Sequence, residues 1–259
     1  MASTRKRHGR FTTALAAAVA MFVSTGTPVD AADKRAVLEL FTSQGCSSCP
    51  PADALLQKFA ADNDLLALSF PVDYWDYLGW KDTLASRDNT ERQYAYAKRR
   101  GDRSVYTPQV IINGREHAVG SDRRAIMKSI KEQADASGGA LTVDVNLDVS
   151  GESVRVTLGD AVKKVPKARV WLVFYNSQET VAIGRGENRG TTITYTNIVR
   201  DMVSLGTWQG DALTFEKARA DLTGKSDYDH CVVIVQRDER GLPGAIIGAS
   251  DPRPVTNPS

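Results

Sequence analysis

The chain is poor in cysteine and histidine, with three of each among its 259 residues. Three cysteines are too few for a disulfide-stapled scaffold. Tetrahedral zinc takes four ligands, and His117 and His230 stand at no ligand spacing from a cysteine. We therefore predict no resident metal and no cofactor. Copper(I) held by two thiolates is the alternative that the chemistry leaves open.

Long apolar runs are also scarce. The clearest one, residues 11–23, is too short to cross a bilayer comfortably, and it follows a basic segment at residues 5–10. Small residues at 29–31 suit a signal peptidase. We therefore predict that residues 1–31 are a secretory signal peptide and that the protein is exported, either to the periplasm or to the medium. An uncleaved membrane anchor is the alternative, but after cleavage we expect no membrane-spanning segment.

A strong excess of charge of one sign is absent. The formal net charge is +2, and loss of four basic residues and Asp30 with the signal peptide changes it to −1. A nearly neutral protein lacks the electrostatic attraction that dominates binding to phosphate backbones. We predict no nucleic-acid partner.

The most informative motif is Cys46-Ser47-Ser48-Cys49, which follows the apolar run 36–41 and precedes Pro50-Pro51. The run predicts a buried strand, and the prolines suit the first turn of a helix. Unpaired N–H groups at a helix N-terminus favour an anion at the first cysteine. We predict that Cys46, exposed at the helix start, is the attacking thiolate and that Cys49, a turn inside, resolves the mixed disulfide. A static disulfide that staples the helix start is the alternative.

The third cysteine, Cys231, opens the apolar run 231–235. Buried cysteines are usually unreactive. We predict a core thiol outside the chemistry.

The periodicity changes at Gly138-Gly139. Before this point strands and helices alternate, with strands expected at 36–41, 65–72, 109–112 and 116–119 and helices at 50–61, 86–99 and 121–136. After it, period-two strands are expected at 141–149, 154–158, 169–175, 191–199 and 230–236. We predict an α/β domain over residues 35–137, an antiparallel β-sandwich over 140–250 and a loose tail at 251–259.

The strand, the two cysteines, the helix and Thr107-Pro108 ahead of a hairpin together resemble the thioredoxin fold. The resemblance implies that the bond before Pro108 is cis, an uncommon arrangement, and that Thr107 and Pro108 pack beside the cysteines. The longer spacing from Cys49 to Pro108 implies an inserted helical segment over 73–101.

Four segments carry a narrower resemblance, at residues 40–53, 72–82, 106–109 and 184–188. They resemble a family of exported bacterial thioredoxin-like proteins that is catalogued as a domain of unknown function, number twelve-twenty-three. The family has no assigned reaction, so the resemblance implies membership and no substrate.

A buried acid beneath the cysteines often accepts the resolving proton in thioredoxins. The matching strand position here is Leu40, and Glu39 is one residue away, which points its side chain to the opposite face. Asp73, at the end of the second strand, is the other candidate. Both also suit ordinary capping or ion-paired carboxylates, which is the interpretation we favour.

The densest aromatic cluster includes Tyr74, Trp75 and Trp80. These side chains could form an apolar wall for a substrate, or pin the inserted segment to the core. The segment 184–190 lacks a phosphate-loop Gly-Lys and instead suggests a structured loop that contacts the redox residues, with Glu187 or Arg185 facing the cysteines.

Together these features predict an exported thiol–disulfide oxidoreductase acting on a protein or small-thiol disulfide, with a membrane redox partner as one source of electrons. The direction of the exchange stays open. The alternative is a non-enzymatic exported binding or scaffold protein with a static disulfide.

Overall fold

The computed structural model describes residues 1–2, 36–137, 141–161, 167–222 and 227–255. The predicted signal peptide therefore lies outside the described residues from residue 3 onward. No helix in the described part of the chain is long and apolar enough to cross a membrane.

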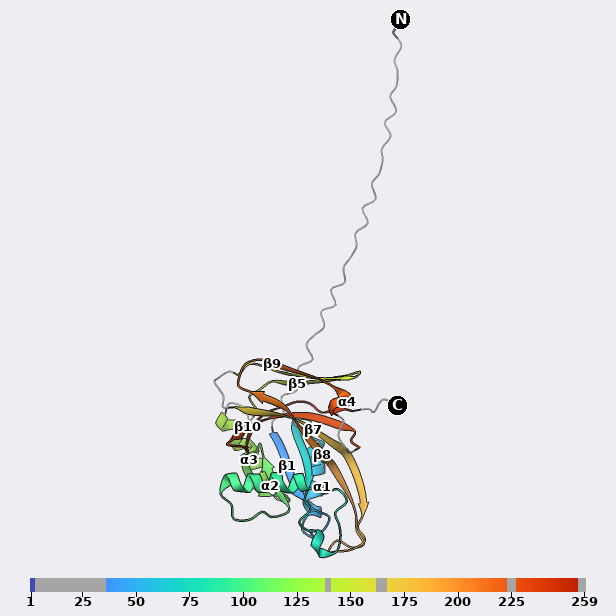
Figure 1. Ribbon diagram of the computed structural model, residues 1–259, viewed down its shortest axis with the longest axis vertical. Coiled ribbons are helices and arrows are strands. Elements are labelled where there is room, and N and C mark those ends of the chain that lie inside the picture. Colours follow the sequence, from blue (N-terminus) through green and yellow to red (C-terminus); the bar gives the residue numbers. More distant parts are fainter. Residues whose placement is uncertain (3–35, 138–140, 162–166, 223–226, 256–259) are drawn as a thin grey trace. The chain divides into compact units, whose positions relative to one another are not determined.

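The described residues form a mixed α/β structure around a nine-stranded sheet (Figure 1). Its strand order is β11-β10-β7-β8-β2-β1-β3-β4, and β12 also pairs with β10. The strands are β1 (Ala36–Thr42), β2 (Leu65–Pro71), β3 (Gln109–Ile112), β4 (Glu116–Val119), β7 (Ala168–Ala182), β8 (Thr192–Trp208), β10 (His230–Glu239), β11 (Leu242–Ala249) and β12 (Arg253–Pro254). β1 and β2 are parallel and buried along their whole length, which explains their nearly continuous apolar sequences.

Three helices cover the two faces of this sheet. They are α1 (Pro50–Ala60), α2 (Arg87–Arg100) and α3 (Arg123–Ser137). Leu38 and Leu40 of β1 pack with the apolar side chains of α1 and α3, whereas Val37 and Phe41 pack with Tyr96 of α2. Because successive strand residues point to opposite faces, α1 and α3 lie on one side of the sheet and α2 on the other.

A second, three-stranded sheet contains β5 (Val145–Ser150), β6 (Ser153–Leu158) and β9 (Leu213–Ala218). Its buried alternate residues, such as Val145 and Val156, pack against Leu172 of β7 and Val233 of β10. Figure 1 shows β5 and β9 on the opposite side of β7 and β10 from α2. Two short helical elements, η1 (Asp76–Leu78) and α4 (Arg219–Leu222), complete the described structure.

The two predicted domains share one sheet. β8, from the second half of the chain, runs parallel to β2 with Ser69 opposite Ile198. The strands β7, β8, β10 and β11 therefore extend the sheet of the first half, while β5, β6 and β9 pack on its face. The change of sequence pattern lies at residues 138–140, outside the described residues, and it marks no break in the sheet.

The prediction of a loose tail is wrong for residues 251–255. Arg253 pairs with Cys231 and Pro254 with His230, so β12 joins the large sheet. Val255 is buried in the core between the two sheets. This apolar residue stabilises a segment whose prolines suggested a free end.

A buried ion pair ties α2 to the centre of the sheet. The Arg92 guanidinium donates to the Glu39 carboxylate at 2.7 Å, and the Glu39 side chain is fully buried. The Tyr96 hydroxyl also donates to this carboxylate, and Arg92 donates to the side chain of Gln236 from β10. The charge of Glu39 is therefore balanced by α2 and linked to the second half of the chain.

We expect Arg92→Leu to lower the free energy of unfolding by about 3–5 kcal/mol, because it leaves the Glu39 carboxylate buried without its cation. Urea denaturation measures the loss. The matched control is Arg87→Leu on the same helix, whose exposed pair with Glu91 contributes about 0.5 kcal/mol or less. Equal losses in the two variants would contradict this assignment.

Candidate redox site

Cys46 and Cys49 form a disulfide in the turn that starts α1. The Cys49 backbone N–H donates to the Cys46 carbonyl at 3.1 Å, and the Cys49 carbonyl accepts from the N–H groups of Ala52 and Asp53. Cys49 is thus the N-cap residue, and the two following prolines occupy positions where no backbone donor is needed. The structure confirms the helix start that the sequence predicts.

Pro108 follows a cis peptide bond, as the resemblance implies, and lies near this helix start. A Cβ on Gly120 would stand 2.6 Å from Leu40 and 3.1 Å from both Ala52 and Pro108. Pro108 and the first turn of α1 therefore approach the same glycine, which leaves room only for a hydrogen. Thr107 accepts a hydrogen bond from the indole N–H of Trp75 at 2.8 Å.

Two of the predicted aromatic residues lie against the motif. Trp75 packs close to Gly45, where an added Cβ would come within 3.0 Å of its side chain. The Trp80 indole donates to Gln44 at 2.8 Å. Tyr74 lies further away and donates to Gln93 of α2, and burial raises its pKa to about 12. Trp75 and Trp80 both pin the 73–82 segment, and both stand beside the cysteines.

Both cysteines are 0% exposed. Segment 183–191 connects β7 to β8 and contacts the cysteine motif. The Asn188 side-chain amide donates to the carbonyls of Gln44 and Cys46, each at 2.9 Å, and Glu187 accepts from the Ser47 N–H at 3.2 Å. Glu187 of this loop faces the cysteine motif, as expected from the sequence, whereas Arg185 is exposed. The expectation that Cys46 is exposed is wrong, because the sulfur is fully buried.

Neither predicted proton acceptor faces the cysteines. Glu39 points toward α2, on the opposite face of the sheet from α1, and its carboxylate is held by Arg92. Asp73 accepts from the Thr90 hydroxyl at 2.6 Å, also on α2. Both carboxylates have the capping or ion-paired role that we favoured from the sequence.

The acid on the cysteine side of the sheet is Asp53, which the sequence analysis missed. It is four residues after Cys49, so it lies on the same face of α1 one turn further along. Its Oδ1 accepts from the Thr42 hydroxyl at 2.8 Å, and its Oδ2 is buried with no hydrogen-bond partner among the described residues. The spacing Cys-x-x-x-Asp on a helix is the signal that could have found it.

Burial raises the pKa of Asp53 to about 7, although the hydrogen bond from Thr42 opposes the shift. A second acid, Asp82, adds to the shift, and burial raises its own pKa too. Asp82 accepts from the Gln44 N–H at 2.7 Å, so it supports the chain just before the cysteines. With a pKa of about 7, the buried Asp53 carboxyl exchanges its proton near neutral pH.

The remaining candidate groups lie elsewhere. Cys231 is buried between the sheets, and burial raises the pKa of its thiol to about 12, which agrees with a core role. His117 contacts Tyr106, and His230 contacts Asp229. In the described ranges, no group of three or more side chains is arranged to hold a metal.

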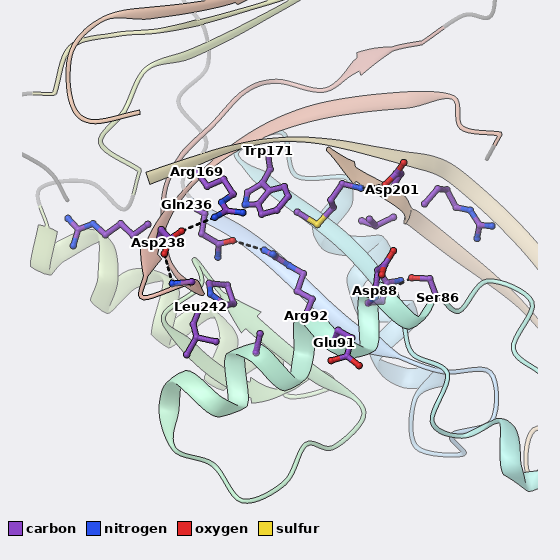
Figure 2. Close-up of a pocket in the computed structure, with 18 residues that line it drawn as sticks. Ser86, Asp88, Glu91, Arg92, Arg169, Trp171, Asp201, Gln236, Asp238 and Leu242 are labelled. Carbon is purple, nitrogen blue, oxygen red and sulfur yellow. Dashed lines mark hydrogen bonds and ion pairs between the residues drawn. The ribbon is translucent and has the colours of Figure 1, made fainter. Parts of the chain in front are cut away.

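A cavity of about 370 Å³ lies on the α2 side of the sheet, away from the disulfide (Figure 2). Figure 2 shows Arg92 reaching from α2 toward Gln236, and Arg169 beside Trp171. Arg169 pairs with Asp238 at 3.0 Å, and its guanidinium lies over the Trp171 ring. The residues that line this cavity lie in or beside α2, β7, β8, β10 and β11 and do not include Cys46 or Cys49.

Residues 37–236 match the protein family described as "Protein of unknown function (DUF1223)". A crystal structure of protein AGR_C_4864 from Agrobacterium tumefaciens is similar, with 38% identity and a TM-score of 0.75 over 84% of this chain and 93% of that one. The structure of HBP35 of Porphyromonas gingivalis shares the fold, with 15% identity and a TM-score of 0.57 over 84% of this chain and 74% of that one. No curated protein matches the chain.

The raised pKa of Asp53 makes stability depend on pH. An unfolded chain releases this proton near the ordinary pKa of 3.8, whereas the folded protein keeps it up to about pH 7. The free energy of unfolding should therefore fall as the pH rises from about 4 to about 7, and level off above. Asp53→Asn removes the titrating group and with it this fall. Between pH 4 and pH 7 we therefore expect the free energy of unfolding of the variant to rise relative to that of the parent by on the order of a few kcal/mol.

Urea denaturation at pH 4 and pH 8 measures the difference. Asp135→Asn, at an exposed pair on α3, is the control and should follow the parent at both pH values. Parallel pH profiles for Asp53→Asn and the parent would show that Asp53 is ionised in the folded protein throughout.

Proposed function

Because the chain belongs to the DUF1223 family, whose function is unknown, we propose from its own site that it is a thioredoxin-like thiol–disulfide oxidoreductase. The observation that carries the proposal is the Cys46–Cys49 disulfide on the first turn of α1, beside Pro108 and ahead of the buried Asp53. The basic and then apolar N-terminal segment supports export, to a compartment where a disulfide persists. The fold family is part of the proposal, supported by the cis bond and by the order of strands and helices.

Cys46 is the attacking residue. Its thiolate would be stabilised by the helix N-terminus, and Ser48 places a hydroxyl 3.5 Å from its sulfur. The thiolate attacks one sulfur of a substrate disulfide, forms a Cys46 mixed disulfide and releases the other sulfur as a thiolate. Trp75 and Trp80 supply apolar surface for a peptide or a small thiol next to this sulfur.

Cys49 resolves the mixed disulfide. The Asp53 carboxylate accepts the Cys49 proton, directly or through one water, and the resulting thiolate attacks the Cys46 sulfur. The second substrate thiolate leaves, and the Cys46–Cys49 bond re-forms with two electrons transferred to the substrate. A protein disulfide or a small-thiol disulfide accepts these two electrons. A membrane redox partner would donate two electrons to reduce the Cys46–Cys49 bond again and so complete the cycle.

A second function is favoured by one observation, the complete burial of both cysteines. A disulfide that stays closed off from its surroundings acts as a staple that fixes the start of α1. The protein would then be an exported binding or scaffold protein.

A disulfide-exchange assay on the mature chain, residues 32–259, separates these functions. We expect Cys46→Ala to abolish reduction of insulin or reshuffling of scrambled ribonuclease, because the attacking sulfur is lost. Cys49→Ala should retain the first attack and accumulate a mixed disulfide visible by mass spectrometry. Cys231→Ala, the same substitution at the buried core thiol, is the control and should keep activity. If Cys46→Ala and the parent are equally active or equally inactive, the scaffold function stands.

The role of Asp53 has a kinetic test. An aryl disulfide that releases a coloured thiolate gives two phases with the reduced protein, the first from Cys46 and the second from Cys49. We expect Asp53→Asn to leave the first phase unchanged and to slow the second by about 100-fold at pH 7, the usual range for a lost general base. Equal slowing of both phases would assign Asp53 a structural role only.

A further inference from the structure

The segment 183–191 closes the free end of the long hairpin formed by β7 and β8. Figure 1 shows these two strands curving away together past the rest of the sheet. Ile183 and Thr191 form the base of the segment, where the Ile183 N–H donates to the Thr191 carbonyl at 2.9 Å. Within it, the Gly190 N–H donates back to the Ile183 carbonyl at 2.8 Å. We call residues 184–190 the tip.

Asn188 holds the tip on the cysteine motif. Its side chain is 7% exposed, and both of its amide hydrogens are used by the carbonyls of Gln44 and Cys46. The Cys46 carbonyl is also the acceptor for the Cys49 N–H, so Asn188 binds the same short turn that the disulfide closes. The Glu187 contact with Ser47 is weaker, since it is 3.2 Å long and exposed to solvent.

The rest of the tip is mostly exposed to solvent. Arg185, Glu187 and Arg189 are exposed, and Gly184 and Gly186 lie over Trp80. Gly186 and Gly190 adopt positive φ angles, 78° and 82°, which glycine reaches without strain. The Asn188 carbonyl accepts from the Thr191 N–H at 3.1 Å and from the Thr191 hydroxyl at 2.6 Å, and these bonds lie within segment 183–191. The tip can therefore leave the motif without breaking them.

We propose that Asn188 controls access to the Cys46–Cys49 disulfide, so that the tip must leave the motif before any thiol reaches either sulfur. The physical reason is that an attacking sulfur needs contact with its target, whereas both cysteines are 0% exposed while Asn188 is in place. Release breaks two buried hydrogen bonds and frees the two carbonyls for a substrate backbone. The inference extends the proposed function, because it says how a covered disulfide meets its substrate.

The test is the rate at which dithiothreitol reduces the disulfide of the folded mature protein. One dithiothreitol gives two electrons and two protons: the Cys46–Cys49 bond breaks, two protein thiols form and the reagent closes its own ring disulfide. Samples are taken at timed points and their thiols are trapped with iodoacetamide. The mass added to the protein, measured by mass spectrometry, gives the rate of disulfide reduction.

We expect Asn188→Ala to raise this rate by roughly ten-fold, as the loss of buried hydrogen bonds at a gate predicts. Asn89→Ala is the matched control. Asn89 is also a buried asparagine that donates to a backbone carbonyl, that of Pro71 at 3.0 Å, but it lies on α2. Its variant should be reduced at the parent rate even though it loses a comparable bond.

A second measurement needs no variant. Arg185 and Arg189 are exposed trypsin sites on either side of Asn188, so limited digestion of the oxidised protein can cut the tip. The cut protein should be reduced at least as fast as Asn188→Ala. The inference is overturned if the Asn188→Ala and cut proteins are reduced at the parent rate, or if Asn89→Ala is accelerated equally.

The test of Asn188 and the test of the oxidoreductase function can fail independently of each other. If Asn188→Ala accelerates reduction while Cys46→Ala changes nothing in the exchange assay, the gate stands and the oxidoreductase fails. If exchange depends on Cys46 while Asn188→Ala is reduced at the parent rate, the oxidoreductase stands and the gate fails.

Discussion

β8 runs beside β2, and this parallel pairing decides where the second half of the chain acts. Ser69 and Ile198 are the register pair of these two strands. The pairing fixes the β7–β8 hairpin relative to β1 and α1. The tip of the hairpin is then carried to the cysteine turn, about 140 residues away in sequence, where Asn188 binds the Cys46 carbonyl.

The two faces of β1 pack against different helices, α2 on one side and α1 with the cysteine turn on the other. Glu39 and the residues that share its face pack against α2, where Arg92 neutralises the carboxylate inside the core. Leu40 points the other way, toward α1, and β1 itself carries no carboxylate on that side. Asp53 supplies the acid from α1 itself and is tied to the end of β1 by Thr42. The two buried acids differ in one respect that matters for proton transfer: Glu39 has a cation and Asp53 has none among its hydrogen-bonding partners.

Local patterns were sufficient for the parts of the molecule that local chemistry determines. β1 was predicted from the apolar run 36–41, and the start of α1 from the prolines at 50 and 51. The β5–β6 pair was predicted from the alternation after residue 140, because burial of one face leaves a period of two in the sequence. Thr107-Pro108 was identified through the resemblance. Pairing between distant strands leaves no such period. The sequence therefore predicted two domains that meet at residues 138–140, and not the one large sheet that the two halves of the chain share. The prediction of a loose tail was wrong for the same reason, because the strand β12 in this segment pairs with the distant strand β10.

The position of the disulfide was predicted from the sequence, whereas part of its surroundings was missed. Cys46, Cys49, Trp75 and Trp80 lie together as expected, and Glu187 reaches the motif as expected. Asp53 was missed because the search for an acid was confined to strands, where the thioredoxin resemblance directs it. Asn188 was missed because an amide that binds two carbonyls has no sequence signature. Both contacts depend on tertiary packing around one helical turn.

The reduction potential of the Cys46–Cys49 pair tests the central claim most directly. Equilibration of the folded mature protein with dithiothreitol or glutathione buffers, followed by thiol trapping, measures it. The account predicts a potential above about −300 mV, in the range of disulfides that exchange. A potential below about −300 mV, or a disulfide that is reduced only after unfolding, would contradict it and identify a structural staple.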